Sequence, residues 1–194
     1  MEQLLVLGTR KKVSSEAVAG TRAALGRVLA EVLDGAGTLA RQGGEAKVSP
    51  AHLLAAIAAD DDLAASLAAW SLTERQAAPS SVTPHTNTQE ETPAATAHRS
   101  LADELAELVG QVTKQVYSDG SIGLGPRSQD TCVDLANSLA AQLGGASAHI
   151  ADRVKSDVIS ADDVRTALLV LLQDELGQLT VRAFTTAAAS ADKR

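Results

Sequence analysis

Side chains that could carry out enzyme chemistry are few in this chain of 194 residues, and they are scattered. The histidines are His52, His85, His98 and His149. None of them has a nucleophile or a carboxylate pair at a spacing that would support acid–base or nucleophilic catalysis. The loop 120–125 has three glycines, but it lacks the Gly-Lys-Ser/Thr ending and the preceding strand of a phosphate-binding loop. The sequence therefore predicts a protein that is not an enzyme and holds no metal or other cofactor.

The composition predicts a helical protein with an acidic surface. Hydrophobic residues make up 45% of the chain, aromatic residues only 2%, and alanine and leucine supply most of the apolar side chains. Lysine and arginine number 17 against 24 aspartates and glutamates, a net charge of -7. This balance argues against a protein that binds nucleic acid through bulk positive charge, so any DNA contact must come from a few well-placed cations.

The single cysteine, Cys132, excludes a disulfide within the chain and a thiolate zinc site. Its apolar neighbours on a predicted helix indicate a small buried core residue. The longest apolar stretches, such as 167–172, are far shorter than the roughly 20 residues that span a bilayer. No signal peptide is recognisable either, so we expect an intracellular protein without a membrane segment.

Two similar units lie on either side of a segment with a different composition. Residues 73–100 hold three of the five prolines among Ser, Thr, Gln and Glu, which is typical of a linker. The flanking units, 1–72 and 101–194, follow the same order: a short helix, a loop, one long helix, a short loop, then a shorter and a terminal helix. The chain therefore reads as two tandem copies of one helical unit.

In the first unit, the long helix is expected to begin near Ser14 or Ser15 and to run to about Gln42. A shorter helix should begin at Pro50, behind the N-cap residue Ser49. The predicted buried face of the long helix repeats at helical spacing and comprises Leu25, Val28, Leu29, Val32, Leu33, Ala36 and Leu39.

In the second unit, helices are expected over 101–116, over a long stretch after the loop 120–126, and from a capping box at 160–163. A final helix should begin at Asp174. The predicted buried face of the long helix comprises Cys132, Leu135, Leu139, Leu143, Ala146, Ile150 and Val154. A helix of about 40 Å flanked by two short ones cannot cover its own apolar stripe, but two copies can cover each other.

Both units resemble core histones. The first is similar to histone two-A and can be aligned with it without a gap from about Lys12 to Leu67. The residues that carry this resemblance are 30–37, 40–41, Pro50, 52–53, 56–57 and 60–63. The second is similar to histone two-B and can be aligned with it without a gap from about Gly125 onward. The residues that carry this resemblance, before and within that range, are 114–116, Asp119, Gly123, Asn137, Gly145, Ala151, Lys155, Ile159, 166–167, 171–172 and 175–176. Such a fusion resembles the histone doublets of large DNA viruses, although those place the two-B half first.

This resemblance implies an all-α protein in which two tandem histone folds pair within one chain as a handshake heterodimer. The long helices would cross antiparallel and the loops would pair at both ends. In this family the loop pairs and the starts of the long helices face the DNA backbone. The positions carried over as DNA-binding are Lys12, Lys47, Arg41, Arg127 and Lys155, with Arg10 and Lys11 extending the first group.

The resemblance also implies a partner-binding acidic patch that receives arginine-bearing peptides. Its carried-over members are Glu31, Asp34, Asp60, Asp61, Asp62 and Glu175. Gly26 and Ala183 replace two acidic residues of the family pattern, so the patch is reduced. The alternative interpretation of each charged group is an ordinary solvated surface charge.

The sequence thus favours a structural DNA-packaging protein in intracellular chromatin, whether nucleus, viral factory or virion. Its expected partners are double-stranded DNA, without sequence specificity, and a doublet or tetramer of the other two core histone types. Membranes and small-molecule substrates are not expected. The acidic balance favours the competing hypothesis, an interaction module that acts as an assembly factor or decoy and binds little DNA.

Overall fold

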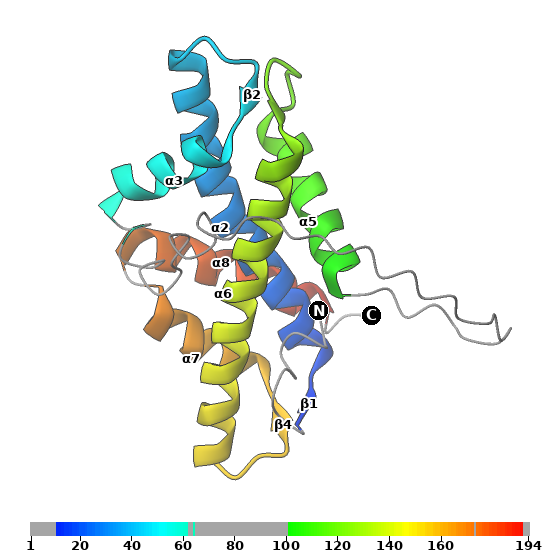
Figure 1. The fold of residues 1–194 in the computed structure, drawn as a ribbon. Coiled ribbons are helices and arrows are strands. Elements are labelled where there is room, and N and C mark those ends of the chain that lie inside the picture. The colour runs from blue at the N-terminus through cyan, green and yellow to red at the C-terminus, as the bar shows by residue number, and fades with distance from the viewer. Residues whose placement is uncertain (1–10, 62–63, 65–100, 173, 192–194) are drawn as a thin grey trace, which may run out of the picture.

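The computed structural model describes residues 11–61, 64, 101–172 and 174–191 (Figure 1). Its elements in chain order are β1 (Lys12–Val13), α2 (Ser15–Gln42), β2 (Lys47–Val48), α3 (Pro50–Ala59), α5 (Leu101–Val116), β3 (Gly123–Leu124), α6 (Pro126–Arg153), β4 (Val158–Ile159), α7 (Ala161–Leu171) and α8 (Asp174–Ala191). The described chain is mostly helical, which confirms the all-α prediction. No described helix is long and apolar enough to cross a membrane. The whole predicted linker 73–100, together with Arg10 and Asp62, lies outside the described residues.

Local hydrogen bonds explain where three of the described helices, α2, α3 and α7, begin. The Ser14 hydroxyl accepts a hydrogen bond from the Ala17 amide at 3.2 Å and caps α2 at the predicted position. The other long helix, α6, begins one residue earlier than predicted. Its first residue is Pro126, which was predicted to lie in the loop. Proline fits the first position of a helix because the backbone N–H group that it lacks would have no partner within the helix there.

The two short helices that follow the long ones both begin with a capping box. Ser160 caps α7, and the Asp163 carboxylate accepts the Ser160 backbone N–H at 2.8 Å, as predicted. In α3 the corresponding partner of Ser49 is His52, whose Nδ1 accepts the Ser49 amide at 3.2 Å. His52 is therefore a hydrogen-bonded structural residue.

Both long helices also end in the same way: the second residue after each helix has a left-handed backbone conformation. Gly44 follows α2 with φ 70°, and Lys155 follows α6 with φ 56°. In each case the next amide donates to a carbonyl in the last turn, from Glu45 to Ala40 and from Ser156 to Ala151. Over the described residues, the two units therefore share their local geometry and the order strand, long helix, strand, shorter helix.

Short parallel strands tie the end of each long helix to the start of the other. β1, just before α2, pairs with β4, just after α6; β2, after α2, pairs with β3, before α6. The two long helices must therefore run antiparallel. Figure 1 shows them crossing near the centre, with one strand pair at each end of the molecule.

The hydrophobic core is built jointly by both units. One cluster joins α2, α3, α5 and α6 through side chains such as Leu33, Leu53, Leu105 and Leu135. A second cluster joins α2 and α6 to α7 and α8. Most of the predicted buried faces are confirmed, and Cys132 is 1% exposed. Val154 is a wrong prediction, because α6 ends at Arg153 and the Val154 side chain is 68% exposed.

The terminal helix α8 packs along α2, the long helix of the other unit. Phe184 on α8 is 2% exposed and is one of the largest fully buried side chains. Its ring lies against Gly20 of α2, where a Cβ atom would come within 2.3 Å of Cε2. Glycine at this position is therefore required by close packing between the two units.

Candidate nucleic-acid and partner-binding surfaces

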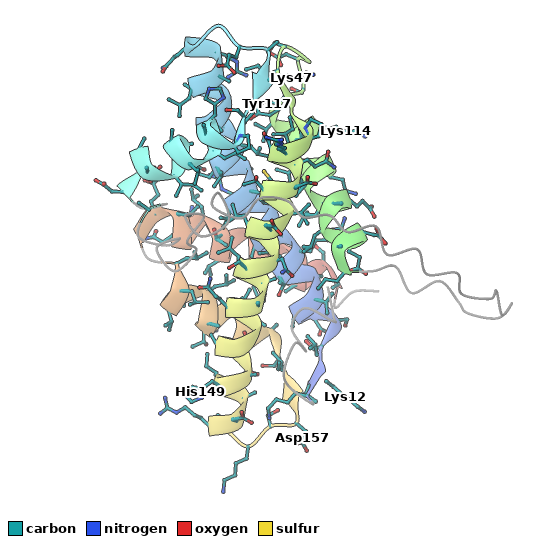
Figure 2. All side chains as sticks on the ribbon, viewed as in Figure 1. Lys12, Lys47, Lys114, Tyr117, His149 and Asp157 are labelled. Carbon is teal, nitrogen blue, oxygen red and sulfur yellow. The ribbon has the colours of Figure 1, made fainter. Side chains whose placement is uncertain are left out.

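The β1–β4 end of the molecule brings together cations from both units. Lys12 lies in β1 opposite Val158, and its side chain is exposed. Lys155 is exposed three residues before Val158, in the loop that leads into β4. Arg153, in the last turn of α6, adds a third exposed cation, which was not among the predicted DNA-binding residues. Asp157 lies at the same end (Figure 2), so the positive charge is partly offset.

Lys11 was expected to extend this group of exposed cations, but its side chain is engaged within the protein. Its ammonium lies 2.8 Å from the Asp152 carboxylate and also donates to the Ser156 backbone carbonyl. The Lys11 side chain is only 14% exposed. Lys11 thus holds β1 against the loop of the other unit, and its positive charge is largely neutralised by the Asp152 carboxylate.

The β2–β3 end carries a second group of exposed cations. Lys47 in β2 lies opposite Gly123, while Arg41 is in the last turn of α2 and Arg127 in the first turn of α6. Figure 2 also places Lys114 at this end, where it is exposed in the last turn of α5. Sequence reasoning did not assign Lys114 to this group, although a basic residue in the last turn of a predicted helix was a signal that could have found it.

Buried hydrogen bonds between the units position this second end. The Ser128 hydroxyl, 0% exposed, donates to the Val48 carbonyl at 2.6 Å. The Tyr117 hydroxyl donates to the Leu33 carbonyl at 2.5 Å, and burial raises the pKa of Tyr117 to about 12. The Val48 carbonyl also accepts a hydrogen bond from the Gly125 amide at 3.2 Å, so the Ser128 hydroxyl adds a second contact between the two units at this strand pair. The strand pair that carries Lys47 is therefore held on a rigid support.

One acidic group accompanies these cations. Asp119 precedes β3 and accepts hydrogen bonds from the side chain and backbone of Ser121, which hold the pKa of its carboxyl below the usual range. The positive charge of Arg41 lowers this pKa further, so Asp119 is ionised at neutral pH. Both ends of the molecule thus combine cations with at least one carboxylate.

The carboxylates predicted to form an acidic patch lie on neighbouring elements. Glu31 and Asp34 are on α2, Asp60 and Asp61 follow α3, and Glu175 is in the first turn of α8. The start of α8 reaches the core that α2 and α3 share, since Leu176 packs into that cluster. Glu31 is already paired with Arg27 at 2.5 Å. Among the described residues, no three His, Cys, Asp or Glu side chains are grouped closely enough to hold a metal ion.

The remaining residues considered for chemistry do not assemble in the described structure. His52 is part of a helix cap, His149 is exposed on α6, and His85 and His98 lie outside the described residues. Burial raises the pKa of Cys132 to about 12, so its thiol is not a nucleophile at neutral pH. Within the described residues, exposed cations gather at the two ends of the molecule, and carboxylates lie on α2, after α3 and at the start of α8.

Comparisons with protein-family models, with curated proteins and with solved structures found no significant match to this chain. What the protein does must therefore be inferred from its own residues and geometry.

Proposed function

We propose that this chain is a fused core-histone heterodimer that packages DNA, together with a partner built from the other two core histone types. The observation that carries this proposal is the reciprocal strand pairing across the crossed long helices. This pairing is what a handshake between two histone folds requires, and it groups cations from both units at two separate ends. The similarity of each unit to a different histone subtype, two-A and two-B, agrees with this arrangement.

DNA would bind across the two ends through its phosphates. At each end, exposed cations stand beside the start of a long helix, where free backbone N–H groups and the helix dipole also attract phosphate. Lys12 and Lys47 occupy positions that carry minor-groove arginines in the resembled family. Lysine keeps the charge but lacks the flat guanidinium, so insertion into the minor groove is weaker.

The net charge of -7 makes low intrinsic DNA affinity an expected property of this chain. A partner would then supply much of the positive charge. Leu169 and Val170 on α7 are 56% and 65% exposed, which leaves an apolar surface that such a partner could cover. The protein would act in intracellular chromatin, whether nuclear, in a viral factory or in a virion.

Nuclease protection of a reconstituted particle tests this proposal. The chain, DNA and a candidate partner of the other two histone types are assembled and digested, and a protected fragment of defined length is expected. Changing Lys12 and Lys47 to glutamate should shorten or abolish the fragment, because both changes place negative charge against phosphate. The matched control is Arg182→Glu, an exposed cation in the middle of α8. Unchanged protection in the double variant would discard the assignment of Lys12 and Lys47.

We also propose that the acidic surface of Glu31, Asp34, Asp60, Asp61 and Glu175 binds arginine-bearing peptides. A fluorescent peptide with one arginine anchor should bind the native chain and should bind the Glu31→Ala plus Asp61→Ala variant more weakly. Equal affinity for both would remove the idea. Since Glu31 is engaged by Arg27, the peptide must displace an existing ion pair, and its affinity should fall with added salt.

The second candidate function is an assembly factor or decoy that keeps the pairing and gives up most DNA binding. The net acidity and the internal use of Lys11 favour it. Under this alternative, the chain would bind a histone-type partner but would yield no protected DNA fragment with it. The nuclease experiment therefore separates the two functions directly.

A further inference from the structure

A groove of about 490 Å³ lies between α2, α5 and α8, away from both strand pairs. Its α2 wall consists of small residues at helical spacing, and its α5 wall is apolar. These lining residues are Ala19, Ala23, Gly26 and Ala30 on α2, and Leu108 and Val112 on α5. Small side chains allow another backbone to approach α2 closely, so the groove has room for an additional segment of chain.

Positive and polar groups stand along this apolar groove. Arg22 and Arg27 line it, together with Gln111, and no carboxylate does. Each arginine has a carboxylate partner outside the groove: Glu107 at 3.8 Å from Arg22, and Glu31 at 2.5 Å from Arg27. All four side chains are between 35% and 42% exposed, so these pairs are weak and can be exchanged for another carboxylate.

We propose that this groove binds an acidic amphipathic helix of a partner protein. The wall from Ala19 to Ala30 spans about 16 Å, which matches roughly three turns of helix. An apolar helix face would cover Leu108 and Val112, and glutamates at its edges would reach Arg22 and Arg27. An apolar floor suits a helix better than a phosphate backbone, and the groove is separate from the cations proposed to contact DNA.

The probe for this site is a capped peptide of about 15 residues, with leucines along one helical face and glutamates along both edges. Fluorescence anisotropy with the full chain should show binding that weakens between about 50 and about 300 mM NaCl. The double variant Arg22→Gln plus Arg27→Gln should lower the affinity about tenfold, because two ion pairs are lost. A peptide with lysine in place of glutamate should not bind.

Filling the groove provides the second variant. A Cβ at Gly26 would sit 3.7 Å from Leu108 and Val112, so Gly26→Leu places a side chain directly in the groove. The matched control is Gly145→Leu on the exposed face of α6, where an added Cβ meets nothing within 4 Å. Gly26→Leu should abolish peptide binding, and Gly145→Leu should leave it unchanged. Circular dichroism and thermal unfolding establish that each variant is folded.

Three outcomes would overturn the inference: no binding of the acidic peptide to the native chain, equal binding of the lysine peptide, or equal binding to the folded Arg22→Gln plus Arg27→Gln variant. Displacement of the peptide by short duplex DNA would also overturn it and would assign the groove to nucleic acid. Because the groove lies apart from Lys12 and Lys47, these variants should leave nuclease protection unchanged, whether or not the chain packages DNA.

Discussion

Replacing Gly20 with alanine tests directly whether the two units share one core. Alanine normally stabilises the interior of a helix by about 0.5 to 1 kcal/mol relative to glycine. At this position, however, the new methyl group would lie 2.3 to 2.7 Å from three atoms of the Phe184 ring. Phe184 belongs to the other unit, 164 positions away in the sequence. We therefore expect Gly20→Ala to destabilise the protein by about 1 to 3 kcal/mol through overpacking.

The sign of this effect should reverse when the ring is removed. Phe184→Leu lacks the Cε2 and Cζ atoms that the new methyl group would meet, and by itself it should cost about 1 to 2 kcal/mol because a cavity forms. In that background Gly20→Ala should be neutral or stabilising. The coupling energy between the two substitutions is thus expected to be about 1.5 to 3 kcal/mol.

Urea unfolding followed by circular dichroism measures all four proteins of this double-mutant cycle. Gly110→Ala on α5 is the control, because nothing lies within 4 Å of its added Cβ, and it should stabilise slightly in both backgrounds. If Gly20→Ala and Phe184→Leu were additive, α8 would not pack on α2 as described, and the shared core would be refuted. Two separate unfolding transitions in the native chain would refute it as well.

Three further results are expected. Lys155→Gly should stabilise the protein by about 1 kcal/mol in thermal unfolding, because glycine relieves the left-handed φ of 56°, whereas Lys155→Ala should give no such gain. Ser128→Ala should cost about 0.5 to 1.5 kcal/mol in urea unfolding, since the Val48 carbonyl loses one of its two donors and keeps the Gly125 amide, and an effect below about 0.3 kcal/mol would contradict this. Burial raises the pKa of both Tyr117 and Cys132 to about 12, so the folded chain holds these protons more tightly. Stability should be complete below about pH 9 and should fall as the pH rises toward about 12; a denaturant midpoint unchanged between pH 8 and pH 11 would be inconsistent with that burial.

The helices could be predicted from the sequence because their determinants are local. Ser14, Ser49 and Ser160 each stand directly before a helix, and each accepts a hydrogen bond from its first turn. The helix over 101–116 is confirmed to the residue. Gly120, with φ 68°, allows the chain to turn shortly after this helix. Periodicity also identified most of the buried faces, although it extended one of them to Val154.

Other features depend on contacts between distant residues, and these could not be predicted. Lys11 reads as a surface cation until α6 brings Asp152 beside it. Nothing in the sequence around Gly20 indicates that the Phe184 ring packs against it and leaves no room for a side chain. The groove beside Gly26 likewise depends on how three helices from two units meet. The candidate DNA-binding cations were proposed through a resemblance, and the structure adds which of them are exposed and which ends they share.

The reciprocal strand pairing has a consequence for how this protein is made on the ribosome. Lys12 finds its strand partner 146 positions later, at Val158, and α2 gains its cover from α8 later still. At about 5 to 20 residues per second, α2 would wait roughly 7 to 30 s after its own synthesis. During that interval the part of its apolar face that α8 covers is available to chaperones or to neighbouring chains. Translation speed between the two units should therefore influence how much protein matures correctly.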